Sequence, residues 1–250
     1  MQAYLYVVSV LFGLILGSFL NVVIYRLPRH ESLVRPGSHC PGCGTAIHWY
    51  DNVPVVSWLV LRGRCRSCGS GISVRYLAVE AATSILFGLA MWRYGLDWRV
   101  LVAWAFIAAM VAVAFIDYDH MIIPDKIVLP GALIGLAASV ALDPRAWWVY
   151  LVSAVGAATF IFVLIMVWPG GMGPGDMKMA LFMGAVLGAG VIVGMFAGFL
   201  LGSIVGIYLI VVKKHSRKSR IPFGPFLALG SLVAIFFGEA IIDSYLSVIS

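Results

Sequence analysis

The chain has 250 residues, of which 62% are hydrophobic and only 11% are charged. Its mean hydropathy of +1.01 is far above that of soluble globular domains, which excludes a soluble enzyme or a soluble binding module. The net charge of +6 would suggest a nucleic-acid partner in a soluble protein. Here the basic residues fall in loops between apolar runs, where membrane orientation and anionic lipid explain them, and no nucleic-acid partner is expected.

Apolar runs long enough to cross a membrane follow one another along the chain, each of about 20 residues. The first lacks the basic start and the small-residue cleavage site of a signal peptide. We therefore predict an all-α polytopic membrane protein with about eight transmembrane helices and a small cytoplasmic zinc-binding domain. The predicted helices cover residues 3–25, 77–95, 99–116, 126–142, 146–168, 177–190, 192–212 and 223–247. The boundary between the sixth and seventh helices, in "GAVLGAGVIVG", has the weakest signal.

The distribution of Lys and Arg between the loops predicts the orientation in the membrane. Residues 26–76 hold seven and residues 213–222 hold five, against two in residues 93–99 and one in residues 143–145. By the positive-inside rule, the two basic segments lie in the cytoplasm, together with residues 117–125 and 169–176, and both termini lie outside. The run "KKHSRKSR" (213–220) is interpreted as an anchor that also contacts anionic lipid.

The long cytoplasmic loop carries two cysteine pairs. They occur in "CPGC" and "CRSC", so that Cys40, Cys43, Cys65 and Cys68 have the spacing C-x2-C-x21-C-x2-C. Four thiolates at this spacing predict a tetrahedral zinc site that supplies folding energy to a small domain. Two disulfides are the alternative, which a reducing compartment disfavours. The zinc would be structural because cysteine fills all four positions, and His39 and His48 are interpreted as surface residues.

Three aspartates lie in "FIDYDHMIIPDK", where one predicted helix ends and the next begins. Asp117 directly continues a membrane-embedded apolar run, and ionisable groups in that setting are functional by default. Asp119 is interpreted as solvated. Asp125 follows Pro124 and is interpreted as a helix N-cap.

A fourth aspartate, Asp176, follows a run of glycines in "GGMGPGDMKM" (170–179). It could be only an N-cap of the next helix. However, Gly173 and Gly175 would let the backbone approach a neighbouring chain or an extended substrate, which a cap does not need. We therefore expect these two glycines to line the substrate approach.

Asp117 and Asp176 are expected at the same membrane depth, which suggests paired-carboxylate chemistry. One carboxylate would activate water while the other holds a proton and polarises the scissile carbonyl. Asp176 would be the more readily ionised member, because it starts a helix whose dipole favours an anion. A cation pathway and a zinc-stabilised scaffold without chemistry remain alternatives. A transporter should have charged residues deep within several spans, whereas only Glu80 lies clearly within a predicted span beyond its cytoplasmic end. A scaffold without chemistry leaves the glycines before Asp176 unexplained.

Five stretches of the chain resemble the type IV prepilin peptidases, and together they run nearly its whole length. They are "GSFLNVVIYRLP" (17–28), residues 40–73 with both cysteine pairs, "FIDYDHMIIPD" (115–125), "GMGPGDMKM" (171–179) and "IPFGPFLALG" (221–230). The resemblance implies that Asp117 and Asp176 are the catalytic pair, the latter closing a Gly-x-Gly-Asp motif shared with preflagellin peptidases and presenilin-type proteases. One departure is Leu77, where the family usually has Pro.

The resemblance also implies what the enzyme would do. Its substrates would be prepilins of type IV pili or pseudopilins of type II secretion, cut between a basic leader and a hydrophobic helix at the cytoplasmic face of the bacterial inner membrane. The new N-terminus would then be methylated with S-adenosylmethionine. Glu80 would either extend to the interface or contact the substrate amine. The domains would be a first transmembrane helix (1–25), the cysteine domain (26–76) and the protease domain (77–250), in an oligomeric state that the sequence does not fix.

Overall fold

The computed structural model describes residues 2–168, 170–212 and 221–249. Within these ranges the chain is helical, and its β structure consists of two isolated bridges, which confirms the all-α prediction. The segment "KKHSRKSR", interpreted as a lipid anchor, lies outside the described residues. The α-helices are α1 (Gln2–Arg26), α2 (Val56–Val60), α3 (Val74–Tyr94), α4 (Arg99–His120), α5 (Asp125–Leu142), α6 (Trp147–Val167), α7 (Pro174–Leu187), α8 (Val191–Val211) and α9 (Gly224–Ile249).

Seven segments of the described chain are long and apolar enough to cross a membrane, so the expected count of eight is not confirmed. The difference lies in Pro174–Val211, which counts once although a 3₁₀ turn at Gly188–Gly190 divides it into α7 and α8. The 14 residues of α7 make a helix of about 21 Å, shorter than the roughly 30 Å hydrocarbon core. The chain nevertheless reverses at Gly188, whose φ is +55°.

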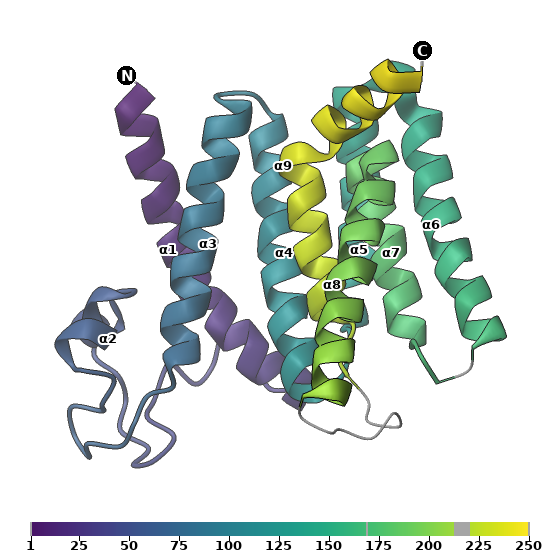
Figure 1. Cartoon of the computed structure of the whole chain (residues 1–250). Helices are drawn as coiled ribbons and strands as arrows, with labels where there is room; N and C mark the ends of the chain where they lie inside the picture. The colour runs from purple at the N-terminus through teal and green to yellow at the C-terminus, as the bar shows by residue number, and fades with distance from the viewer. Residues whose placement is uncertain (1, 169, 213–220, 250) are drawn as a thin grey trace. The chain divides into compact units, whose positions relative to one another are not determined.

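The chain divides into two compact units, Met1–Leu96 and Asp97–Ser250. In the first unit, α1 packs along α3, and the connection between them contains α2 and the cysteines (Figure 1). Small residues permit close helix contact in membranes, and a Cβ at Gly17 would lie 2.8 Å from Cα of Glu80. The domain boundaries predicted at residues 25 and 76 remain a prediction. In the structure, α3 packs with α1 in the first unit and does not belong to the second unit.

The second unit is a bundle of α4 to α9 (Figure 1). Helices α6 and α7 pack antiparallel, since Gly184 meets Ala154 and Gly188 meets Tyr150. Helices α8 and α9 also pack antiparallel, and a Cβ at Gly230 would lie 2.1 Å from the carbonyl oxygen of Gly194. Helix α9 also packs on α4. The C-terminal end of α4 therefore meets the N-terminal end of α9.

Candidate functional site

Asp117 lies in the last turn of α4, where its side chain is buried, with 5% of the residue exposed. The helix ends at His120, because Met121 adopts a left-handed conformation (φ 54°) and donates its N–H to the Asp117 carbonyl at 2.8 Å. The Asp117 carboxylate is held from another helix. Its Oδ2 accepts a hydrogen bond of 2.8 Å from the backbone N–H of Gly224, the first residue of α9.

Asp176 lies in the first turn of α7 and is also buried, with 6% exposed. The N-cap position belongs to Gly173, and Asp176 follows at the third helical position. The Asp176 Oδ2 accepts a hydrogen bond of 2.8 Å from the backbone N–H of Gly173. The interpretation of Asp176 as the N-cap itself is therefore wrong, although its carboxylate does bond back to the N–H of the N-cap residue.

The two carboxylates lie close enough to interact electrostatically. Each one also accepts a hydrogen bond from the N–H at the start of a helix, where the helix dipole favours an anion. The helix dipole therefore favours an anion at Asp117 as much as at Asp176, so it does not make Asp176 the more readily ionised member. Gly224 was not among the predicted site residues, although it lies in "IPFGPFLALG", one of the stretches that carry the family resemblance.

Three other residues near the two aspartates in sequence can now be placed. Asp119 is exposed, in contrast to Asp117 two positions earlier. The interpretation of Asp125 as an N-cap is wrong, because Pro124 holds that position and the Asp125 carboxylate instead pairs with Lys178 Nζ at 2.7 Å. A Cβ at Gly175 would lie 2.9 Å from Cβ of Ile123, so this chain's own loop fills the space beside that glycine.

The four cysteines converge on one point in the first unit. Their sulfur atoms all lie within 4.8 Å of one another, and the Sγ atoms of Cys40 and Cys68 are 3.8 Å apart. Tetrahedral zinc with bonds of about 2.3 Å places neighbouring sulfurs about 3.8 Å apart. None of the four cysteines forms a disulfide. The geometry and the donor set fit a metal ion, and neither His39 nor His48 belongs to the cluster.

Both cysteine pairs lie in turns of the same form. Gly44 donates its N–H to the Cys40 carbonyl at 2.8 Å, and Gly69 donates to the Cys65 carbonyl at 2.9 Å. Each glycine has φ of +71°, which side-chain-bearing residues rarely adopt. Hydrogen bonding to Ser70, then to the backbone of Cys43 and Gly42, lowers the pKa of Cys40 to about 6. A thiolate is the form that a metal requires.

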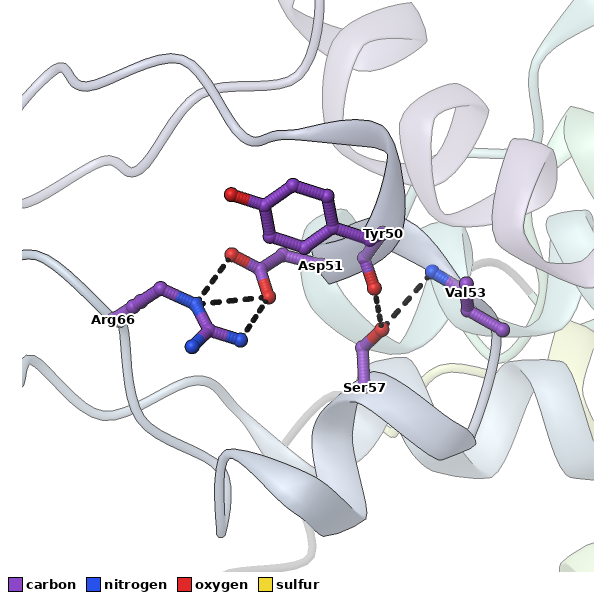
Figure 2. A network of polar contacts seen from close by, with 5 residues as sticks. All are labelled: Tyr50, Asp51, Val53, Ser57 and Arg66. Atoms are coloured by element: carbon purple, nitrogen blue, oxygen red, sulfur yellow. Dashed lines mark hydrogen bonds and ion pairs between the residues drawn. The ribbon is translucent and has the colours of Figure 1, made fainter.

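An ion pair joins the second cysteine turn to the rest of this domain. Figure 2 shows Arg66, from "CRSC", facing the carboxylate of Asp51, with contacts of 2.6, 2.8 and 3.1 Å. The guanidinium of Arg66 lowers the pKa of Asp51 through these hydrogen bonds. Ser57 donates to the Tyr50 carbonyl at 2.9 Å and accepts from the Val53 N–H at 3.0 Å, which ties α2 to the segment that carries Asp51 (Figure 2).

Glu80 is buried in α3, with 8% exposed. Its Oε2 accepts a 2.7 Å hydrogen bond from the Val55 N–H, and the side chains of Ser18 and Asn21 also hydrogen-bond to it. It therefore does not extend to the interface as an isolated charge.

Comparison with known proteins assigns both parts of the chain to one family. Residues 11–94 match the bacterial peptidase A24 N-terminal domain, and residues 104–210 match the type IV leader peptidase family. A prepilin leader peptidase/N-methyltransferase of Pseudomonas putida is 35% identical over 97% of this chain and 94% of its own length. The proteins of that name from Bacillus subtilis and Pseudomonas aeruginosa are 34% and 33% identical, over 94% and 95% of this chain and 96% and 92% of their own lengths. No solved structure matches the chain. The chain belongs to the type IV leader peptidase family, as a relative of the prepilin leader peptidase/N-methyltransferases.

Proposed function

We propose that this protein is a membrane aspartyl protease that cleaves the leader from prepilins or pseudopilins and then N-methylates the new N-terminus. The observation that carries the proteolytic activity is the buried pair of Asp117 and Asp176, brought together from α4 and α7. The second activity rests on the relatives named prepilin leader peptidase/N-methyltransferase.

The pair can perform peptide hydrolysis with one shared proton. The ionised carboxylate takes a proton from water, whose oxygen attacks the scissile carbonyl, while the protonated carboxyl donates a hydrogen bond to the carbonyl oxygen. Collapse of the tetrahedral intermediate breaks the C–N bond, and a proton passes to the departing amine. The leader leaves with a carboxylate, and the hydrophobic helix begins with a free amine.

The substrate requires the pair to lie at the cytoplasmic face of the inner membrane, and the loop charges support that orientation. Anionic lipid at the same face is a further expected partner. A protease acts on extended peptide, because the carbonyls of a helix are already hydrogen-bonded. Gly173 supports such an approach, since the atoms nearest to a Cβ there would be Asp176 Oδ2 at 3.8 Å and Gly175 N at 3.9 Å.

Two ligands complete the proposal. Zinc, bound by Cys40, Cys43, Cys65 and Cys68, would hold the two cysteine turns together, and the distances between the sulfurs support it. S-adenosylmethionine would supply the methyl group for N-methylation.

The test is cleavage of a purified prepilin, with and without S-adenosylmethionine, followed by mass measurement of the product. The native enzyme should remove the leader whether or not the methyl donor is present. With the donor, the mass of the cleaved product should rise by about 14 Da, which corresponds to one methyl group on its new N-terminus. Asp117→Ala and Asp176→Ala should each lower the cleavage rate roughly 10²–10⁴-fold. The double variant should be no slower than either single one, since members of a catalytic unit are non-additive. Asp119→Ala should have a smaller effect. Near-normal cleavage by either single variant would refute the pair.

A further inference from the structure

The short helix α2 turns its apolar side outward and its polar side toward the cysteine domain. Val56, Leu59 and Val60 are each more than half exposed, and their spacing of i, i+3 and i+4 puts them on one face of the helix. Ser57, on the other side, is buried and hydrogen-bonds to the segment before the helix (Figure 2). An apolar helix face ordinarily packs on a core. The aliphatic face of α2 therefore requires a cover from outside the domain.

Trp58 holds α2 in this orientation. Its ring lies over Gly63, where a Cβ would be 2.8 Å from the ring, and its Nε1 donates a hydrogen bond of 3.2 Å to the Ile72 carbonyl. These contacts attach α2 to residues 63–72, which include the second cysteine pair. The aliphatic face cannot turn inward without breaking them, so its exposure belongs to the folded domain.

A hydrogen bond to α3 gives the level of α2 along the transmembrane helices. Val55, directly before α2, donates its N–H to Oε2 of Glu80 at 2.7 Å. Glu80 is six residues, or about 9 Å, beyond Val74, the first residue of the candidate span Val74–Tyr94. Helical side chains point back toward the start of their helix. The start of α2 is therefore level with the first two turns of α3, not with the water beyond them (Figure 1).

Helix α1 gives the same level for the segment before α2. Ile15 and Phe19 of α1 line a hollow of about 370 Å³ whose other wall includes Asn52 and Pro54. Phe19 lies seven residues before the end of α1 at Arg26. The start of α2 thus lies beside both transmembrane helices, inside their ends. An outward-facing side chain at this level meets lipid headgroups and the first part of the acyl chains, about 5–10 Å deep.

The charge at the end of α2 favours lipid over a second copy of the chain. Arg62 and Arg64 follow the aliphatic face, both are exposed, and neither forms an ion pair within the described residues. Guanidinium groups bind phosphate, which every phospholipid headgroup carries. Two copies packed face to face through α2 would instead bring their arginines together, and like charges oppose such a contact.

We infer that α2 is an interfacial helix, with Val56, Leu59 and Val60 inserted into the phospholipid leaflet at the N-terminal end of α3. Arg62 and Arg64 contact the phosphates of the same leaflet. The connection between α1 and α3 is therefore embedded in part and not wholly aqueous, and α2 attaches the cysteine domain to the bilayer. The inference is independent of the proposed proteolysis and methylation.

The first test uses the native full chain in vesicles of phosphatidylcholine and phosphatidylglycerol. A small fraction of the lipid carries a photoreactive diazirine, either near the glycerol backbone or at the end of an acyl chain, and adducts are mapped by mass spectrometry. The shallow probe should label residues 56–60, and the deep probe should label them at least about threefold less, because an interfacial helix lies at a shallow depth. Leu11, exposed in the middle of α1, should react with the deep probe and is the internal control.

Two results of this test would overturn the inference. One is the absence of adducts on residues 56–60 while α1 is labelled. The other is shallow labelling of α2 that disappears as the ratio of protein to lipid is raised, which would show that a second copy covers the face.

The second test changes the aliphatic face itself. Leu59→Asp should lower shallow labelling of Val56 and Val60 at least about threefold, because a carboxylate resists transfer out of water. Val34→Asp is the matched control, since Val34 is an exposed valine of the same connection outside α2, and it should leave that labelling unchanged. Unchanged labelling in Leu59→Asp, or an equal loss in both variants, would contradict insertion of this face. If Leu59→Asp does not fold, the two probes on the native chain decide the question.

Discussion

Asp117 and Gly224 are 107 positions apart in the chain, yet a single hydrogen bond joins them at the candidate catalytic pair. A Cβ at position 224 would lie 2.7 Å from Oδ2 and 3.0 Å from Cβ of Asp117. Such a contact is too short to persist. The carboxylate, at the end of a short side chain, is the group that can move most easily to relieve it.

Gly224→Ala should therefore reduce cleavage strongly while changing stability little. A displacement of about 1 Å at a catalytic group can cost on the order of 10²-fold in rate, whereas rotation of one side chain should cost less than about 1.5 kcal/mol. The measurements are the cleavage rate at saturating substrate and the thermal midpoint of unfolding in detergent. Gly206→Ala in α8 is the control, because no atom lies within 4 Å of a Cβ there. Normal cleavage by Gly224→Ala would show that Gly224 does not position Asp117.

The candidate catalytic aspartates could be proposed from sequence because a carboxylate adjoining an apolar run is costly and therefore noticeable. Gly224 could not be identified in the same way. A glycine is common in transmembrane helices, and its role here is a backbone N–H directed at another helix. Only the packing of α9 on α4 brings that donor to Asp117.

At the scale of elements, the corner between α4 and α5, up to the first residue of α5, meets the start of α7 through two contacts, in addition to the packing of α5 on α7. One is apolar, between Ile123 and the face of Gly175, and the other is the ion pair of Asp125 with Lys178. The ion pair is substantially exposed, with side-chain exposures of 54% and 31%, so it should contribute little to stability. The glycine contact is therefore the more important of the two for holding Asp176 beside Asp117.

Gly175→Ala should impair cleavage because its new Cβ meets Ile123. The substrate-approach explanation of this glycine predicts the same loss for another reason, and a double-mutant cycle separates the two. If Ile123 causes the loss, Gly175→Ala combined with Ile123→Gly should cleave faster than the product of the two single effects allows. Strictly additive effects on the logarithm of the rate would favour contact with the substrate instead.

The cysteine domain is a second element whose stability depends on an interaction that helix packing does not supply. Metal analysis should find about one zinc per chain. Cys65→Ser should lower the zinc content and make residues 26–76 more accessible to limited proteolysis, whereas Ser67→Ala, within the same turn but without a ligand atom, should change neither. A metal-free native protein that resists proteolysis equally well would contradict the structural-zinc prediction.

For the whole molecule, the sequence predicts the class and most helices because hydropathy reports directly on the membrane environment. The count of eight spans is not confirmed, because Pro174–Val211 counts as one apolar segment although the 3₁₀ turn at Gly188–Gly190 divides it into two helices. The grouping of α3 with α1 was also not foreseen. It depends on glycine-mediated contacts at Gly13 and Gly17, and hydropathy contains no information about which helices pack together.

The orientation of the molecule can be tested at the two ends of α5. Lys126, in the first turn of this helix, and Arg145, beyond its C-terminal end, are both exposed. In whole cells, a membrane-impermeant maleimide should label Arg145→Cys, whereas Lys126→Cys should react only after the inner membrane is permeabilised. The native protein provides the background, because its cysteines are predicted on the cytoplasmic side. The reverse pattern would invert the topology and contradict cleavage at the cytoplasmic face.

The backbone donors at the aspartate pair have a consequence for inhibitor resistance. Gly173 and Gly224 hold the two carboxylates through N–H groups, which every residue except proline retains. An inhibitor that bonds to both carboxylates would therefore need the carboxylates in the positions that these two N–H groups fix. Amino-acid substitution at positions 173 and 224 rarely removes an N–H group. Resistance by substitution at position 224 would have to add bulk there, which would also move Asp117 and so reduce cleavage itself.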